Sequence, residues 1–480
     1  MSGKKISSLA RNSVVGIVLG ASKVCVQLLA LPIVANLLGP SEFAIYALAF
    51  PAVSFFLVLA DAGINGTLAR EEESNEQVWS TAFWAVFLLC LTLQIFVILL
   101  GIFIAFIAGE PRLKGLMFLL SFCLPLLGLT NVASARLYRR GRVQYLASSD
   151  AAATVIGVSF GIACAYEGLG AASLAVQLVM IFSARMLLVN IVAFRKPMLI
   201  FKFSDISRHA VASFTIVLSR LSEFAGRTLE NVVFQKVFGL PSLGVYNLGN
   251  QIARFVCDAI GNPVWASLYA HALHTSHEDL RSLSVRTVSA VGYIVFPIAV
   301  LLMFSADPLF GILMSDRWHS AADVVELLIV FYGMSSVLGL VGAVLTAAGA
   351  PTAIFLANFI LYLLRIFCVS LGGMLGFQVT VFFVAFATFA YVGILLFGAR
   401  RSFGFRPVEL SVPLCKALVS CTALSVVFGA MNLFLSSSLV FLVCKCAVSL
   451  AVYVCFLRVL GVEELSFVLS RLSSIRWNRT

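Results

Sequence analysis

This sequence has few charged residues. Only 11% of its 480 residues are Asp, Glu, Lys or Arg, whereas 61% are hydrophobic, and the mean hydropathy is +1.03. This composition excludes a soluble globular protein. The net charge of +11 would suggest nucleic acid, but no hydrophilic segment is long enough to form a binding domain, so we expect no nucleic-acid partner. Because a spanning helix needs ~20 apolar residues, the composition predicts an all-α polytopic membrane protein.

Patterns for disulfides and metals are also missing. The eleven cysteines all fall in apolar runs, and neither a disulfide framework nor a zinc pattern emerges. A helical face could present His271, His274 and His277 to a metal, but the third would have rotated well off the first. We therefore interpret them as an interfacial helix end and expect no metal and no cofactor. The apolar run after the basic N-terminus is too long for a cleaved signal, which predicts a retained first span.

Apolar runs bounded by charges, Gly and Pro repeat along the whole chain. We interpret each run as one membrane-spanning helix. The fourteen predicted spans lie near residues 12–36, 45–68, 78–108, 115–135, 147–166, 171–194, 209–233, 243–270, 287–305, 323–348, 353–373, 378–399, 413–432 and 439–460.

Lys and Arg are unevenly divided between the alternate loops. With the N-terminus inside, the inner loops hold 21 of the 33 basic residues and the outer loops hold 4. Because cytoplasmic loops are enriched in Lys and Arg, we predict that both termini are cytoplasmic. The acidic loop 69–77 falls inside against expectation, although acidic residues contribute little to this rule.

A short segment recurs at an offset of 200 residues. GPSEFAIYALA at 39–49 aligns without a gap with GLPSLGVYNLG at 239–249. The copies join spans 1 and 2 and spans 7 and 8, so six spans separate them and both have the same orientation. This is the arrangement of transporters built from two parallel halves. We predict two six-helix lobes, 1–200 and 201–400, with an additional helix pair and a tail at 401–480.

Several charged residues fall inside predicted spans, where a charge at the bilayer centre costs ~2.5 to 3.5 kcal/mol. Span 7 carries Arg220, Glu223, Arg227 and Glu230. Their spacing of 3, 4 and 3 residues places all four on one helical face. Arg254 and Asp258 follow on span 8, and the offset equates Lys23 with Glu223. We predict that these faces line a cleft between the lobes. The predicted anion-binding residues are Lys23, Arg220, Arg227 and Arg254, and the predicted ion-coupling residues are Asp61, Glu223, Glu230 and Asp258.

A structural alternative is that these charges form ion pairs within one helix, kept for assembly. It is compatible with the transport hypothesis. A purely structural helix could have used Leu at every site, whereas paired charges with a basic surplus suit a hydrated path for an anion. Arg gives bidentate contacts to phosphate that Lys cannot.

Several segments resemble one membrane-protein family. They are RNSVVGIVLGASKVCVQLLALPIVANLLGPSEFAIYALAF, with Asp61-Ala62-Gly63 closing span 2, LPSLGVYNLGNQIARF, FPIAVLLMFSADPLFGILMSDRW and AVLTAAGAPTAIFLANF. Over roughly residues 10–400 the chain is similar to bacterial polysaccharide and O-antigen flippases, the Wzx-like branch of the multidrug/oligosaccharidyl-lipid/polysaccharide exporter superfamily. That family often has Asp at the position of Asp61.

The resemblance implies fourteen helices in two lobes around a cationic cavity in the bacterial inner membrane. It implies alternating access for an undecaprenyl-diphosphate-linked oligosaccharide, coupled to H+ or Na+, in the synthesis of O-antigen, exopolysaccharide or capsule. Implied partners are the substrate, membrane lipid, a polysaccharide polymerase and a chain-length regulator.

Two other functions stay open at this stage. A cation-coupled multidrug antiporter of the same superfamily is one, although a cationic cleft would repel the positive substrates such proteins usually carry. A membrane glycan polymerase or ligase is the other, but it would be expected to carry a large outer loop, and the longest one here, about 306–322, is short. We therefore expect a transporter and not an enzyme.

Overall fold

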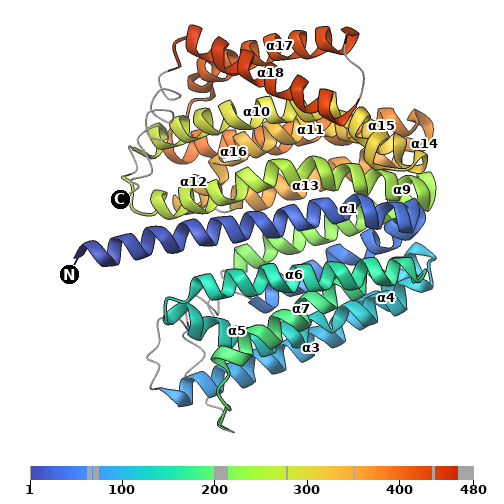
Figure 1. Cartoon of the computed structure of the whole chain (residues 1–480), viewed down its shortest axis with the longest axis vertical. Coiled ribbons are helices and arrows are strands. Elements are labelled where there is room, and N and C mark those ends of the chain that lie inside the picture. The colour runs from blue at the N-terminus through green and yellow to red at the C-terminus, as the bar shows by residue number, and fades with distance from the viewer. Residues whose placement is uncertain are drawn as a thin grey trace. The chain divides into compact units, whose positions relative to one another are not determined.

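The computed structural model describes residues 2–61, 68, 75–198, 200, 214–276, 279–350, 352–434 and 438–462, and within these ranges every regular element is a helix. The chain groups into two compact units, residues 1–244 and 245–480. The helices can be followed by label in Figure 1. The first unit contains α1 (Ser2–Asp61), α3 (Glu76–Ala108), α4 (Arg112–Ser121), α5 (Cys123–Arg139), α6 (Val143–Tyr166), α7 (Ala171–Ala193) and the first part of α9 (Phe214–Ala272).

The second unit begins within α9 and is also helical throughout its described residues. Its further elements are α10 (Asp279–Leu313), η1 (Asp316–Trp318), α11 (His319–Gly339), α12 (Val341–Ala347), α13 (Thr352–Ser370), α14 (Gly372–Leu375), α15 (Phe377–Phe386), α16 (Thr388–Phe403), η2 (Pro407–Leu410), α17 (Ser411–Phe434) and α18 (Leu439–Val459). The predicted lobes, 1–200 and 201–400, are defined by the sequence repeat, whereas the compact units are defined by contacts between residues. The lobe boundaries therefore stay a prediction.

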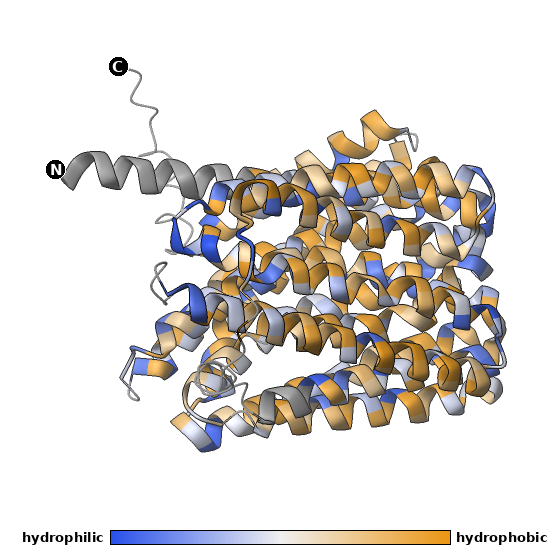
Figure 2. Cartoon of the chain, turned by 90° about the horizontal axis from the view of Figure 1, so that it is seen from below, coloured by the Kyte–Doolittle hydropathy of each residue, from blue (hydrophilic) through white to orange (hydrophobic). Residues whose placement is uncertain are grey.

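Long apolar helices confirm the predicted all-α membrane architecture. Within the described residues, 11 helical segments are long and apolar enough to cross a membrane. Figure 2 shows hydrophobic residues along these helices and hydrophilic residues toward many of their ends. Segment Cys25–Ala60 is counted once although the sequence predicts two spans there, and charged α9 is not among the 11. The count of fourteen therefore stays a prediction.

The two copies of the repeat adopt the same backbone conformation. Gly39 interrupts α1 with φ 74° and ψ 170°, and Gly239 interrupts α9 with φ 84° and ψ 169°. L side chains rarely adopt this left-handed φ, so glycine is required at both positions. Pro40 follows Gly39 and its fixed φ suits the first turn of the next helical stretch. Each helix is thereby divided at the point where the sequence predicts the turn between two spans.

The part of α9 before Gly239 packs within the first unit. The Phe224 ring stacks on Phe55 of α1 with the ring centroids 5.1 Å apart. Asn231 Nδ2 donates a hydrogen bond to the Ala47 carbonyl at 2.9 Å, and Gln235 Nε2 donates to the Ala108 carbonyl at 3.0 Å. These side-chain amides satisfy carbonyl oxygens inside an apolar bundle and fix the position of α9 against α1 and α3.

Charged residues tie three connections of the first unit together at one end. Glu42, just after the Gly39 kink, accepts hydrogen bonds from Arg112 Nη1 at 2.6 Å and from the Ala171 backbone N–H at 2.9 Å. Arg112 Nε also donates to Glu110 at 2.8 Å. That hydrogen bond holds the pKa of Glu110 below its usual range and keeps the carboxylate charged at neutral pH.

The C-terminal helix pair, α17 and α18, packs on α10 in the second unit. Lys445 is 2% exposed, and its Nζ donates to Asn432 Oδ1 at 2.8 Å, which joins α18 to α17. Tyr453 Oη donates to the Tyr293 carbonyl at 3.0 Å, which joins α18 to α10. The predicted additional pair is therefore a packed part of its unit.

Candidate functional site

The charged face predicted on span 7 exists on the first part of α9, where Glu223 forms ion pairs with Arg220 and Arg227. Glu223 lies between two guanidiniums: Arg227 Nη2 approaches it at 2.9 Å and Arg220 Nη1 at 3.3 Å. The pairs have the predicted i, i+3 and i, i+4 spacing. Arg220, Glu223 and Arg227 together carry one positive charge in excess, and the fourth member of the face, Glu230, brings a second carboxylate.

Exposure falls along this face from Arg220 to Glu230. The Arg220 side chain is 57% exposed and that of Arg227 is 30% exposed, whereas Glu230 is 3% exposed. Glu230 lies beside Asn231, whose amide bonds to the carbonyl of Ala47. The arginine end of the face is thus the accessible end, and Glu230 lies where α9 packs closely within its unit.

The second part of α9 carries the other predicted pair, in the second unit. Arg254 Nε lies 3.8 Å from Asp258 Oδ2, and both side chains are partly exposed. The predicted pairing is confirmed in its geometry. The structural alternative is therefore realised at all three predicted pairs, and the assignment of these residues to substrate or ion binding stays a prediction.

Two predicted residues lie on α1. Lys23 is partly exposed and lies sixteen residues before Gly39, the same separation that Glu223 has from Gly239. Asp61 is the last residue of α1, and its side chain lies outside the described part of the chain, as do Ala62 and Gly63. The structure therefore gives Lys23 and Glu223 equivalent positions in the repeat.

A buried polar relay in the second unit was not predicted. Arg365 on α13 is 4% exposed; its Nη2 donates to Tyr332 Oη at 2.6 Å and its Nε to the Val384 carbonyl at 3.3 Å. Tyr332 Oη in turn donates to Asn250 Oδ1 at 2.5 Å, one helical turn before Arg254. The relay links an arginine inside a predicted span to the polar surface of α9. Arg365 lies 33 residues from Tyr332, and Tyr332 lies 82 residues from Asn250. No local sequence pattern could therefore predict the relay.

The histidines set aside in the sequence fall at the end of α9. His271 lies in its last turn and His274 in the turn that follows, while His277 lies outside the described residues. Among the residues that the structure describes, no group of three or more His, Cys, Asp or Glu is placed to hold a metal ion.

The chain is similar in sequence to two bacterial proteins. It is 21% identical over 311 residues to the succinoglycan biosynthesis transport protein ExoT of Rhizobium meliloti strain 1021, covering 64% of this chain and 63% of that protein. It is 21% identical over 323 residues to the lipopolysaccharide biosynthesis protein WzxC of Escherichia coli strain K12, covering 66% of this chain and 65% of that protein. The chain thus spans just under two thirds of the length of both relatives.

Solved structures show the same fold. The lipid II flippase MurJ in an inward closed conformation matches with a TM-score of 0.69 at 12% identity, over 92% of this chain and 98% of that one. An inward-facing multidrug resistance transporter of the MATE family matches with a TM-score of 0.63 at 16% identity, over 80% of this chain and 98% of that one.

The family itself is shown by a match over residues 33–323 to the family described as polysaccharide biosynthesis protein. This segment covers more than half of the chain and includes both copies of the repeat and both parts of α9. It confirms the resemblance read from the sequence. The chain is a multi-pass membrane protein that belongs to the polysaccharide biosynthesis protein family.

Proposed function

We propose that this protein is a flippase that moves an undecaprenyl-diphosphate-linked oligosaccharide across the bacterial inner membrane, with both termini in the cytoplasm. Three findings support the proposal: membership of the polysaccharide biosynthesis family, the similarity to ExoT and WzxC, and the fold shared with the lipid II flippase MurJ. The product would be an O-antigen, exopolysaccharide or capsule, made with a polymerase and a chain-length regulator.

The observation that carries the proposal is the set of Arg220, Glu223 and Arg227 on α9. A charge placed in a membrane helix is costly unless it faces a partner or water, and this set retains one positive charge in excess. Half-exposed arginines suit the diphosphate of a lipid-linked sugar, since guanidinium binds phosphate oxygens in pairs. Sugar and diphosphate would cross along this polar face while the polyprenyl chain stays in hydrocarbon.

Deletion of the gene tests the function itself. We expect the lipid-linked oligosaccharide to accumulate in the cytoplasmic leaflet, and mass analysis of extracted lipids would show both its accumulation and its sugar composition. Re-expression of the intact chain should return the intermediate to its original level. A deletion strain with an unchanged pool of lipid-linked oligosaccharide and normal surface glycan would refute the flippase function.

The acidic residues are our candidates for coupling transport to H+ or Na+, namely Asp61, Glu223, Glu230 and Asp258. Glu223→Gln and Asp61→Asn remove a charge at nearly constant volume, so each should make transport less responsive to pH and sodium gradients. Transport into vesicles with imposed gradients measures this, and exposed Glu167→Gln, in the turn between α6 and α7, is the matched control. If transport by the wild-type protein is independent of both the pH gradient and the sodium gradient, a coupling role is contradicted.

A multidrug antiporter is the second candidate, because the MATE transporter shares the fold. The sign of the charge on α9 argues against it. An Arg-Glu-Arg set with a positive surplus repels the cationic compounds that such antiporters usually carry. Export of a cationic dye that depends on this protein would favour this candidate over the flippase.

A further inference from the structure

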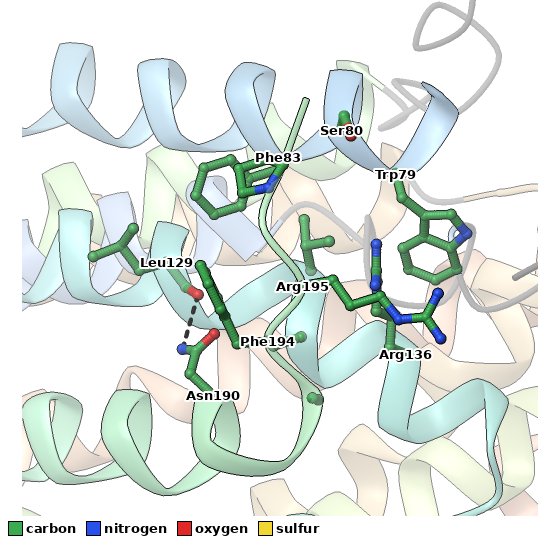
Figure 3. Close-up of a pocket in the computed structure, with 12 residues that line it drawn as sticks. Trp79, Ser80, Phe83, Leu129, Arg136, Asn190, Phe194 and Arg195 are labelled. Atoms are coloured by element: carbon green, nitrogen blue, oxygen red, sulfur yellow. Dashed lines mark hydrogen bonds between the residues drawn. The ribbon is translucent and has the colours of Figure 1, made fainter. Parts of the chain in front are cut away.

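A second charged region of the first unit lies where α3 begins and where α5 and α7 end. After α7, residues 194–198 and 200 run as an extended strap along α3. The strap is held by the Met198 N–H, which donates to Ser80 Oγ at 3.0 Å, and by Trp84 Nε1, which donates to the Met198 carbonyl at 2.9 Å. Beneath it is a small pocket (Figure 3). Its lining includes Trp79, Ser80, Phe83, Arg136, Asn190 and Arg195.

Arg136 is the buried cation of this pocket. It is 4% exposed, and its guanidinium carbon lies 5.1 Å from the centre of the fully buried Trp79 ring. Its Nη2 donates to Glu76 at 2.9 Å, whereas its Nη1 is buried and has no hydrogen-bond partner among the described residues. A buried charged donor without an acceptor is costly, so Nη1 marks a position where an acceptor is missing.

The two arginines of the pocket pair with the same carboxylate. Glu76 is shared, because Arg195 Nη1 also donates to it, at 2.5 Å. One carboxylate therefore accepts hydrogen bonds from both arginines. Arg195 is 45% exposed and lines the pocket from the strap. Figure 3 shows Arg136 and Arg195 grouped beside Trp79.

The sequence predicts that this pocket lies near the cytoplasmic membrane surface. Arg139, Arg140 and Lys196 follow the pocket residues in sequence, on the side that the distribution of basic residues predicts to be cytoplasmic. Phe194, 57% exposed, and Trp84 provide the aromatic side chains typical of the interface. Basic pockets between helices at this level bind anionic headgroups.

We propose that this pocket binds a phosphate group, with one phosphate oxygen accepting a hydrogen bond from Arg136 Nη1 and Arg195 closing over the group. The enclosed space is about 20 Å³, which accommodates a single oxygen-sized group, so the rest of the phosphate lies at the mouth. The phosphate belongs either to the headgroup of an anionic lipid or to a free phosphate ion. The proposal does not depend on the flippase function, because binding alone tests it.

The test measures binding to the purified full-length protein after lipid removal. The probes are dioctanoyl phosphatidylglycerol, inorganic phosphate and, as a lipid without phosphate, dioctanoylglycerol. We expect saturable binding of at least one phosphate-bearing probe, weakened about ten-fold or more by Arg136→Gln and by Arg195→Gln, because each removes a charged hydrogen-bond donor. Arg142→Gln is the control, since it removes the same charge from an exposed turn outside the pocket.

Trp79 supplies a readout that leaves both arginines intact. Binding beside its ring should change the fluorescence of the wild-type protein, and this change should be lost in Trp79→Phe while the protein still binds the probe. Binding of phosphatidylglycerol alone identifies a lipid headgroup as the source, and binding of inorganic phosphate alone identifies a soluble anion; either supports the proposal. Binding that Arg136→Gln and Arg195→Gln leave unchanged, equal binding of dioctanoylglycerol, or no saturable binding at all would overturn it.

Discussion

Replacing Arg227 with alanine is expected to lower glycan export by about ten-fold to one-hundred-fold while the protein still inserts and folds. A hydrogen bond from a charged donor contributes about 1.5 to 3 kcal/mol, and each 1.4 kcal/mol is a factor of ten. Arg227 is 30% exposed and pairs with Glu223 at 2.9 Å, so it combines access to substrate with a fixed position. Export is measured as surface glycan in the deletion strain that carries the variant at matched protein levels.

Two further substitutions show whether the effect belongs to the site. Arg220→Ala should have a smaller effect, since Arg220 is 57% exposed and lies farther from Glu223, at 3.3 Å. Arg142→Ala removes a charge from the exposed turn between α5 and α6 and should leave export unchanged. If Arg220→Ala and Arg227→Ala both export glycan normally, the charged face of α9 does not bind the substrate and only the ion-pair interpretation remains.

Alanine at Gly244 is expected to destabilise the protein by about 1 to 3 kcal/mol and to reduce export strongly. A Cβ atom there would overlap the Pro40 carbonyl oxygen and lie 2.6 Å from the carbonyl carbon. Because both atoms belong to the backbone, no side-chain rotation relieves the overlap, and overpacking of this kind costs about 1 to 3 kcal/mol. Thermal unfolding of the purified variant, together with export in cells, measures the two effects.

The matched control for Gly244 lies in the same unit. Gly115 on α4 has open space around its Cβ position, so Gly115→Ala should leave export unchanged and raise helix stability by about 0.5 to 1 kcal/mol. Equal unfolding temperatures for Gly244→Ala and the wild type would show that the two segments do not approach as closely as the structure has them. The contact matters because it joins the two copies of the repeat, residues 39–49 and 239–249.

Most of the helical architecture was predictable from the sequence. Apolar runs such as 413–432 and 439–460 correspond to α17 and α18, at Ser411–Phe434 and Leu439–Val459. Such runs are sufficient because a helix satisfies its own backbone hydrogen bonds, which is a strict requirement in lipid. The repeat also identified Gly39 and Gly239, since only glycine readily adopts their left-handed φ.

The charged contacts of this protein differ in how far apart their partners lie in the sequence. The pairs that Glu223 forms with Arg220 and Arg227 were predictable, because residues three and four apart are neighbours on any helix. The contacts of Arg136 with Glu76, 60 residues away, and of Arg195 with Glu76, 119 residues away, were not. From the sequence, Arg136 and Arg195 contributed only to the count of basic residues that predicts the membrane orientation.

By itself the sequence determined that this protein is a bundle of membrane helices with a repeat and a charged face on α9. These are local properties, set by composition and by the 3.6-residue period of the helix. Only the tertiary structure decided which polar groups from distant helices meet: Arg136 with Glu76, Arg365 with Tyr332, and Gly244 with the Pro40 carbonyl. Such pairings depend on how helices pack, and many packings bury similar apolar surfaces, whereas the few polar contacts form in only one of them.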